Sequence, residues 1–63
     1  MPVISISLGK IPSETKKSLV AAITATASTV TQMPQDNFIV LIHELPDDAI
    51  GVGGKVLQEM QSV

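Results

Sequence analysis

The sequence predicts an α/β (α+β) fold: a β-α-β unit with parallel strands and a long crossover helix, followed by a short C-terminal β-hairpin. Three observations predict it: an alternating apolar segment near the start, a long central stretch without Gly or Pro, and an unbroken apolar run that precedes a glycine-rich turn. A strand, a helix and a buried strand in this order form a right-handed crossover connection between parallel strands.

The first strand is predicted over Val3–Leu8, where apolar and small polar residues alternate. Ile4, Ile6 and Leu8 lie on one face of such a strand, and the residues between them lie on the other. The segment Gly9–Pro12 ends the strand, because its glycine and proline favour a turn.

The central helix is predicted from Glu14 to about Gln32, with Ser13 as its N-cap. An acidic residue in the first turn is favourable, because it faces the positive end of the helix dipole. Two stripes follow the helical spacing: an apolar one of Leu19, Ile23, Ala27 and Val30, and one of small residues, Ser18, Ala22, Ala25 and Thr29. The small-residue stripe is interpreted either as a contact with another subunit or as a solvent-facing surface.

The second strand is predicted over Phe38–Ile42, after a loop at residues 33–37. Its apolar residues do not alternate, as expected for a strand that is covered on both faces. Residues 46–48 favour a turn, Gly51–Gly54 is suited to a hairpin turn, and Lys55–Leu57 is predicted as a short final strand.

The chain is too short to bury its own apolar surface. It has 63 residues, of which 44% are hydrophobic, and no cysteine that could form a disulfide. A single domain of this size, predicted over residues 1–63, buries only about 60% of the surface of its unfolded chain. We therefore expect oligomerisation, with the excess apolar surface buried between subunits.

The composition argues against several classes of protein. The formal net charge is −2, the 4 basic residues are all lysines, and Phe38 is the one aromatic residue. Nucleic-acid binding relies on clustered basic residues and stacking aromatic ones, so we expect no nucleic-acid partner. One histidine without cysteine does not make a structural zinc site, and we expect no metal. No signal peptide or membrane span is recognised, so no membrane partner is expected and the expected location is cytoplasmic.

Pro2 is the strongest candidate for chemistry. Removal of Met1, which small second residues permit, leaves Pro2 with a free secondary amine. Such an amine serves as a general base or nucleophile when burial lowers its pKa, because desolvation disfavours the charged form. A retained Met1 would make the same nitrogen an amide, which is neither basic nor nucleophilic.

Together these features resemble the 4-oxalocrotonate tautomerase family, in its short-subunit branch. The resemblance covers nearly the whole chain and rests on Pro2, the β-α-β unit, Ile42–Leu45 at the end of the second strand, and Gly-Val-Gly-Gly at 51–54. It implies a tautomerase-like fold and a homo-oligomer, a hexamer built as a trimer of dimers, in which each site includes more than one subunit. It also implies a small carbonyl or enol substrate and no cofactor.

The resemblance implies that Pro2 is catalytic, but other family positions differ. An arginine that binds the substrate carboxylate and one that polarises the substrate carbonyl align with Ile11 and Ile39, and an aromatic residue before the glycines aligns with Ile50. Isoleucine cannot replace a guanidinium group, which binds carboxylates bidentately. Lys10 is the nearest basic candidate for an anionic substrate group, and Ile39 and Ile50 are the other substrate-binding candidates.

The leading functional prediction is a tautomerase, an isomerase in which Pro2 is the general base. The reaction would be keto–enol or 1,3-allylic proton transfer on a 2-oxo acid or a related carbonyl compound. One alternative is a non-catalytic or partner-dependent subunit of a mixed oligomer. Another is Pro2-dependent hydratase, decarboxylase or carbon–carbon bond chemistry.

The remaining polar residues are given structural roles. His43 and Glu44 are adjacent on a strand and so point to opposite faces. His43 is interpreted as a structural or interface residue, and Glu44 as an interface salt-bridge member or an acid that supports the site. Lys16 and Lys17 are expected to face water, and residues 47–48 are expected to form a turn.

Overall fold

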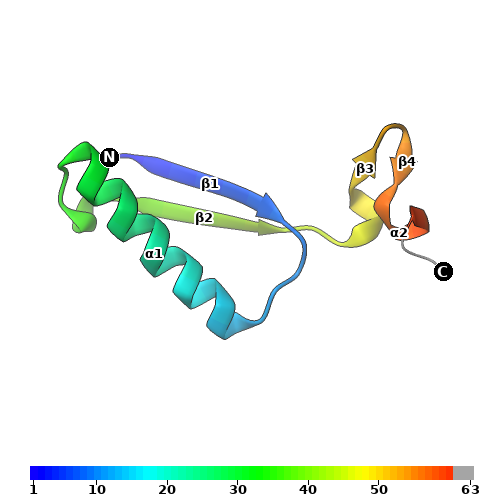
Figure 1. Ribbon diagram of the computed structural model, residues 1–63, viewed down its shortest axis with the longest axis horizontal. Coiled ribbons are helices and arrows are strands. Elements are labelled where there is room, and N and C mark those ends of the chain that lie inside the picture. The colour runs from blue at the N-terminus through cyan, green and yellow to red at the C-terminus, as the bar shows by residue number, and fades with distance from the viewer. Residues whose placement is uncertain (61–63) are drawn as a thin grey trace.

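The computed structural model describes residues 1–60 and contains the predicted β-α-β unit (Figure 1). Strands β1 (Val3–Leu8) and β2 (Ile39–Glu44) pair in parallel, and helix α1 (Ser13–Thr31) connects them. The register pairs the first residue of one strand with the first residue of the other, and the last with the last. The predicted fold class is therefore confirmed.

The two-stranded sheet has one covered and one open face. Even-numbered residues of both strands are half-buried on the face that α1 covers, whereas odd-numbered residues are exposed on the other face. Among the exposed side chains are Val3 (55% exposed), Ile39 (38%) and Leu41 (43%). The expectation that the second strand is covered on both faces is not met within one chain, because a single helix covers only one face.

Helix α1 starts one residue earlier than predicted. Ser13 is its first residue and Pro12 is its N-cap, and no side chain of the helix forms a capping hydrogen bond. The extended backbone of Pro12 (φ −62°) already fills the cap position, so the prediction of a Ser13 cap is wrong. At the other end Gln32 stops the helix in the left-handed conformation, with φ of 60°.

The helix packs on the sheet through most of the predicted apolar stripe. Leu19, Ile23 and Ala27 are half-buried. Val30, the last member of the stripe, is 77% exposed. The small-residue stripe is also exposed along its whole length. The chain's own sheet therefore covers only part of the apolar surface that α1 presents.

The C-terminal part of the chain extends away from the β-α-β unit (Figure 1). It comprises a short 3-10 helix η2 (Asp47–Ala49), strands β3 (Gly51–Val52) and β4 (Lys55–Val56), and helix α2 (Leu57–Met60). The two strands pair antiparallel, so the predicted hairpin is confirmed. Residue 57, predicted to end the last strand, instead begins α2.

A single chain has no complete hydrophobic core. None of residues 1–60 is buried. The radius of gyration is 15.0 Å and the molecule measures 45 × 24 × 15 Å, whereas a compact chain of this length has a radius of gyration of about 11 Å. The accessible surface of 4744 Å² likewise exceeds the roughly 3,900 Å² that is typical of a compact monomer of this mass. The layer between α1 and the sheet is thus only a partial core.

Candidate active site

Two of the predicted site residues meet where the strands begin. Pro2 is half-buried, and its carbonyl accepts a hydrogen bond of 3.0 Å from the N–H of Ile39. Met1, ahead of it, is 88% exposed. The same end of the sheet carries a hollow of about 330 Å³ lined by Met1, Asp36 and Asn37.

Sequence reasoning did not single out Asp36 or Asn37. Both belong to η1 (Gln35–Asn37), a 3-10 helix in the connection between α1 and β2. The predicted parallel pairing could have indicated them, because parallel strands place the residues that precede one strand beside the residues that precede the other. The predicted pairing of the two strands could therefore have placed this connection beside Pro2.

The other two predicted site residues lie beyond the opposite end of the sheet. Lys10 is exposed in the loop after β1. Ile50 is half-buried between η2 and β3, and its carbonyl accepts a hydrogen bond of 2.7 Å from the N–H of Leu57. A hollow of about 400 Å³ lies beside the loop and is lined by Lys10, Leu45, Pro46, Asp47 and Gln58.

One chain therefore does not bring its four predicted site residues together. Pro2 and Ile39 lie at one end of a six-residue strand pair, and Lys10 and Ile50 lie beyond the other end. A strand of this length spans about 20 Å, which is too far for one small substrate to touch both ends.

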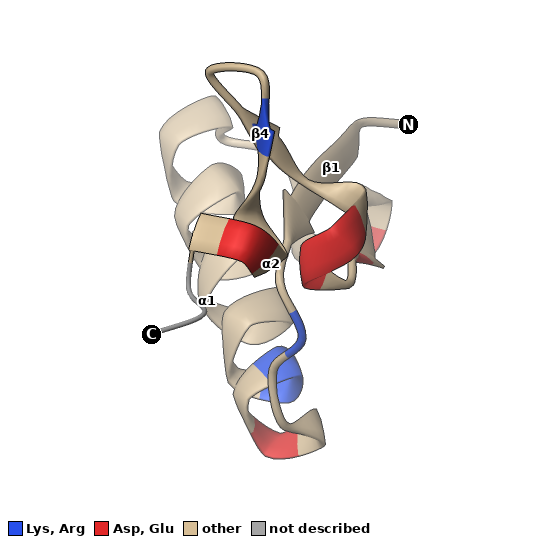
Figure 2. Ribbon diagram, turned by 90° about the vertical axis from the view of Figure 1, so that its right-hand side faces the viewer, with Lys and Arg blue, Asp and Glu red and all other residues tan. Residues whose placement is uncertain are grey.

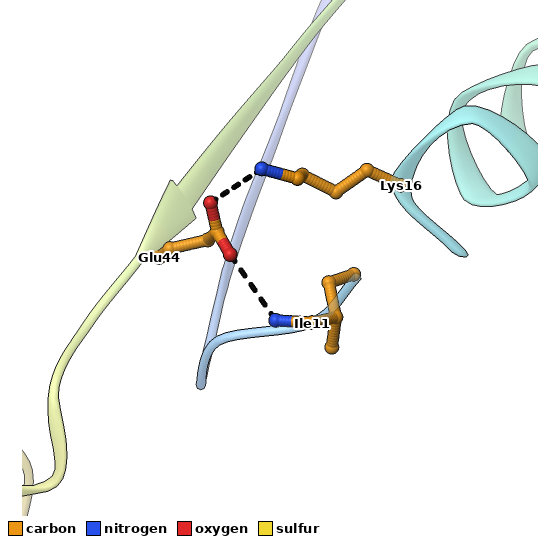
Figure 3. A network of polar contacts seen from close by, with 3 residues as sticks. All are labelled: Ile11, Lys16 and Glu44. Carbon is orange, nitrogen blue, oxygen red and sulfur yellow. Dashed lines mark hydrogen bonds and ion pairs between the residues drawn. The ribbon is translucent and has the colours of Figure 1, made fainter. Parts of the chain in front are cut away.

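Glu44 forms a polar network that ties three elements together (Figure 3). One of its carboxylate oxygens pairs with the Lys16 ammonium at 2.6 Å, and the other accepts a hydrogen bond of 3.1 Å from the backbone N–H of Ile11. The end of β2, the loop after β1 and the first turns of α1 are thereby held against one another. The side chains keep 34% (Lys16) and 28% (Glu44) of their surface exposed.

The network changes the electrostatics of Glu44 and corrects one prediction. The hydrogen bond from Lys16 and then that from the Ile11 N–H favour the ionised carboxylate, so the pKa of Glu44 lies below its ordinary value. The nearby positive charge of Lys10 acts in the same direction. The expectation that Lys16 faces water is wrong, because its long side chain reaches back to the end of β2. Glu44 is a salt-bridge member, as predicted, but the ion pair lies within the chain.

Charged residues are distributed unevenly over the chain (Figure 2). Acidic residues lie on η2 and α2, the start of α1 carries lysines together with the acidic Glu14, and β4 carries a lysine. Residues 47–48, predicted to form a turn, are the first two residues of η2. Lys17 is 78% exposed, in agreement with its predicted contact with water. His43 is exposed on the open face of the sheet.

A further hollow lies on the flank of α1 and β2. It has a volume of about 440 Å³ and is lined by Lys16, Lys17, Val20, Ala21, Val40 and Ile42. No predicted site residue borders it. Within residues 1–60, no group of three or more His, Cys, Asp or Glu side chains is arranged to hold a metal ion, and neither helix is long and apolar enough to cross a membrane.

Comparison with known proteins identifies the family of this chain. A family model described as tautomerase enzyme matches residues 2–60. The chain belongs to the tautomerase family. A probable tautomerase from Bacillus cereus is 39% identical over 46 residues, which cover 73% of this chain and 75% of that relative.

Solved structures of other tautomerase-fold proteins superimpose closely on this chain. DmpI from Archaeoglobus fulgidus has a TM-score of 0.86 and 32% identity, with 90% of this chain and 98% of that chain covered. A heterohexameric 4-oxalocrotonate tautomerase from Chloroflexus aurantiacus has a TM-score of 0.78 and 27% identity, with 95% of both chains covered. Membership of the tautomerase family confirms the resemblance noted from the sequence and supports isomerase activity of the tautomerase type.

Proposed function

We propose that this tautomerase-family protein uses Pro2, with Met1 removed, as the general base of a proton-transfer reaction. The substrate class is a 2-oxo acid or a related carbonyl compound. Pro2 takes a proton from the carbon next to the carbonyl, and the proton is returned to another carbon or to oxygen. The net result is keto–enol or 1,3-allylic isomerisation without a cofactor.

The position of Pro2 is the observation that carries this proposal. Its carbonyl is held by the N–H of Ile39 at 3.0 Å, so the residue is anchored while its nitrogen lies at the very start of the strand. Met1 is 88% exposed, which leaves the bond between Met1 and Pro2 open to an aminopeptidase. Partial burial of the Pro2 ring favours a neutral amine, because removal from water disfavours the charged form.

The complete site requires a second protomer. Lys10 and Ile50 lie too far from Pro2 of their own chain, so the residues that bind the substrate body and its anionic group are supplied by a neighbouring copy. A backbone N–H, a water molecule or Lys10 then polarises the substrate carbonyl, since the chain contains no arginine.

We propose a homo-hexamer, a trimer of dimers, as the functional assembly. The open face of the sheet presents Val3, Ile39 and Leu41, and burial of such surface stabilises an assembly by about 25 cal/mol per Å². A single chain buries none of residues 1–60, so the apolar layer between α1 and the sheet is completed only when copies associate.

A second candidate function is that of a partner-dependent subunit in a mixed oligomer. The absence of arginine from the chain favours it, because a different subunit could supply guanidinium groups. The Chloroflexus aurantiacus relative forms a heterohexamer, so this mode of assembly exists on the same fold. Purified protein that is inactive alone and gains activity when mixed with another tautomerase-fold chain from the same organism would favour this candidate.

Modification of the Pro2 nitrogen tests the leading proposal. Its acetylation keeps the proline ring and removes only the basicity, so it should lower kcat/KM for an arylenolpyruvate by at least about 10²-fold, the smaller end of what a general base contributes. Pro2→Ala is the comparison variant, because it removes the proline ring but keeps a terminal amine and should therefore lose less activity than the acetylated protein. Full activity of the acetylated protein would exclude an amine mechanism, and an intact mass that shows retained Met1 in the native host would exclude it as well.

A further inference from the structure

Asp36 lies in the hollow at the proline end of the sheet. The hollow has a volume of about 330 Å³ and is lined by Met1, Asp36 and Asn37. When Met1 is removed, the amine of Pro2 takes the place of the Met1–Pro2 peptide group beside this hollow. Asp36 and the amine then lie at the same end of the sheet.

The backbone fixes Asp36 with respect to Pro2. Asp36 is the middle residue of η1 (Gln35–Asn37), and the N–H groups of the two residues that follow Asp36 donate backbone hydrogen bonds of 3.1 Å that close this turn. Directly after these two residues, Ile39 donates its N–H to the carbonyl of Pro2 at 3.0 Å. A rigid turn and one hydrogen bond therefore connect the two residues.

Other charged side chains of the β-α-β unit lie far from this end. Strand β1 carries no charged side chain. The ionisable residues of β2, His43 and Glu44, lie at the end of β2 that is remote from Pro2. The charged residues of α1 all lie in its first turns, and its last turn carries none. Within residues 1–45 of one protomer, Asp36 is thus the one charged side chain at the proline end. No lysine of the same protomer lies at this end to offset its field on the amine.

We propose that the Asp36 carboxylate stabilises the positive charge that Pro2 acquires when it accepts the substrate proton. The inference rests on the proposed function of Pro2. In that step the substrate C–H bond breaks, its electron pair passes into the enolate, and the new N–H bond leaves a formal positive charge on nitrogen. An opposite charge nearby lowers the energy of the product of this step and hence of the transition state that leads to it.

The same charge also adjusts the strength of the base. An apolar site alone lowers the pKa of an amine, and an amine with a pKa far below ambient pH is a weak base. A carboxylate beside it favours the protonated form and brings the pKa back toward neutrality. Asp36 therefore acts on the reaction through the charge on Pro2, and it need not touch the substrate.

A titration of the proline nitrogen tests this inference without any assay of activity. The chain from Pro2 to Val63 is short enough for chemical synthesis with ¹⁵N-proline at the first position. Asp36→Asn should lower the midpoint of the ¹⁵N titration by about one pH unit relative to the wild type, because it removes the charge that favours the ammonium form. Glu14→Gln, which removes a carboxylate that is 89% exposed in the first turn of α1, is the matched control and should leave the midpoint unchanged.

Kinetics provide the second measurement. The acidic limb of the pH profile of kcat/KM should move to lower pH in Asp36→Asn, with a loss of about tenfold in kcat, and Asp36→Glu should restore most of both. Equal midpoints in the wild type and Asp36→Asn, or an equal fall in Glu14→Gln, would overturn the inference. A different result would contradict the proposed function itself: a synthetic wild-type chain that assembles but transfers no proton.

Discussion

Among the described residues, Glu44 forms side-chain hydrogen bonds that reach far along the chain. Its carboxylate binds Lys16, which lies 28 positions away, and the backbone of Ile11, which lies 33 positions away. Both partners stabilise the ionised form, so the pKa of Glu44 is lower in the folded chain than in the unfolded one. A group with a lowered pKa stabilises the fold above its unfolded-state pKa and loses this effect as the pH falls through the folded-state pKa.

Glu44→Gln should therefore lower the melting temperature at neutral pH. The difference in melting temperature from the wild type should disappear below about pH 4. The amide can still accept the hydrogen bond from Ile11 but loses the charge that pairs with Lys16. Glu14→Gln is the control, because Glu14 is 89% exposed and lies 4.0 Å from its lysine partner. Thermal melts between pH 3 and pH 7 measure both. A difference that persists unchanged at pH 3 would contradict the pairing.

Lys10 is the residue that we expect to bind the anionic group of a substrate. Lys10→Ala should raise KM for a monocarboxylate enol by about tenfold or more, the value of one charge-assisted hydrogen bond, with little effect on a neutral enol. The wild type should prefer monocarboxylates to dicarboxylates, because Ile11 and Ile39 offer no second anion contact. Lys17→Ala removes a lysine that is 78% exposed and is the control. A strong preference for a dicarboxylate that Lys10→Ala leaves unchanged would contradict this account.

At the scale of the element, the hairpin depends on two glycines. Gly53 and Gly54 have φ of 61° and 87°, and both conformations are unfavourable for L-residues. A Cβ atom at either position would meet nothing within 4 Å. Any cost of substitution is therefore conformational and not steric crowding by neighbours.

Gly54→Ala should destabilise the protein by about 1–2 kcal/mol, the cost of a left-handed conformation for an L-residue. D-alanine at the same position, which chemical synthesis permits, should cost nothing, because positive φ is favourable for the D-enantiomer. Denaturant unfolding at equal protein concentrations compares the two chains. Equal destabilisation by L- and D-alanine would show that the hairpin does not need this backbone conformation.

At the scale of the whole molecule, the open face of the sheet decides whether the chain assembles. Leu41 is 43% exposed there, so Leu41→Asp creates no unpaired buried charge in a single chain. In an assembly the same carboxylate would be buried without a partner, which costs several kcal/mol. The variant should be monomeric by light scattering at micromolar concentration and should lose helical circular dichroism. Thr15→Asp, on the exposed start of α1, should assemble normally.

Much of the fold could be predicted because its signals are local. Alternation over Val3–Leu8, the absence of Gly and Pro from the helix, and Gly51–Gly54 each constrain the backbone within a few residues. The candidate site could be predicted less well. Lys16 was expected in water and Asp36 was not considered, because their surroundings depend on residues brought close by the parallel pairing of β1 and β2.

The sequence by itself determined the order and type of the main elements and the shortage of core, since these follow from periodicity, turn residues and length. Only the tertiary structure decided that Glu44 binds Lys16 within the chain, that Leu57 begins a helix, and that the site residues divide between two ends of the sheet. These features depend on contacts between residues far apart in the sequence, and such contacts exist only once the strands are paired in register.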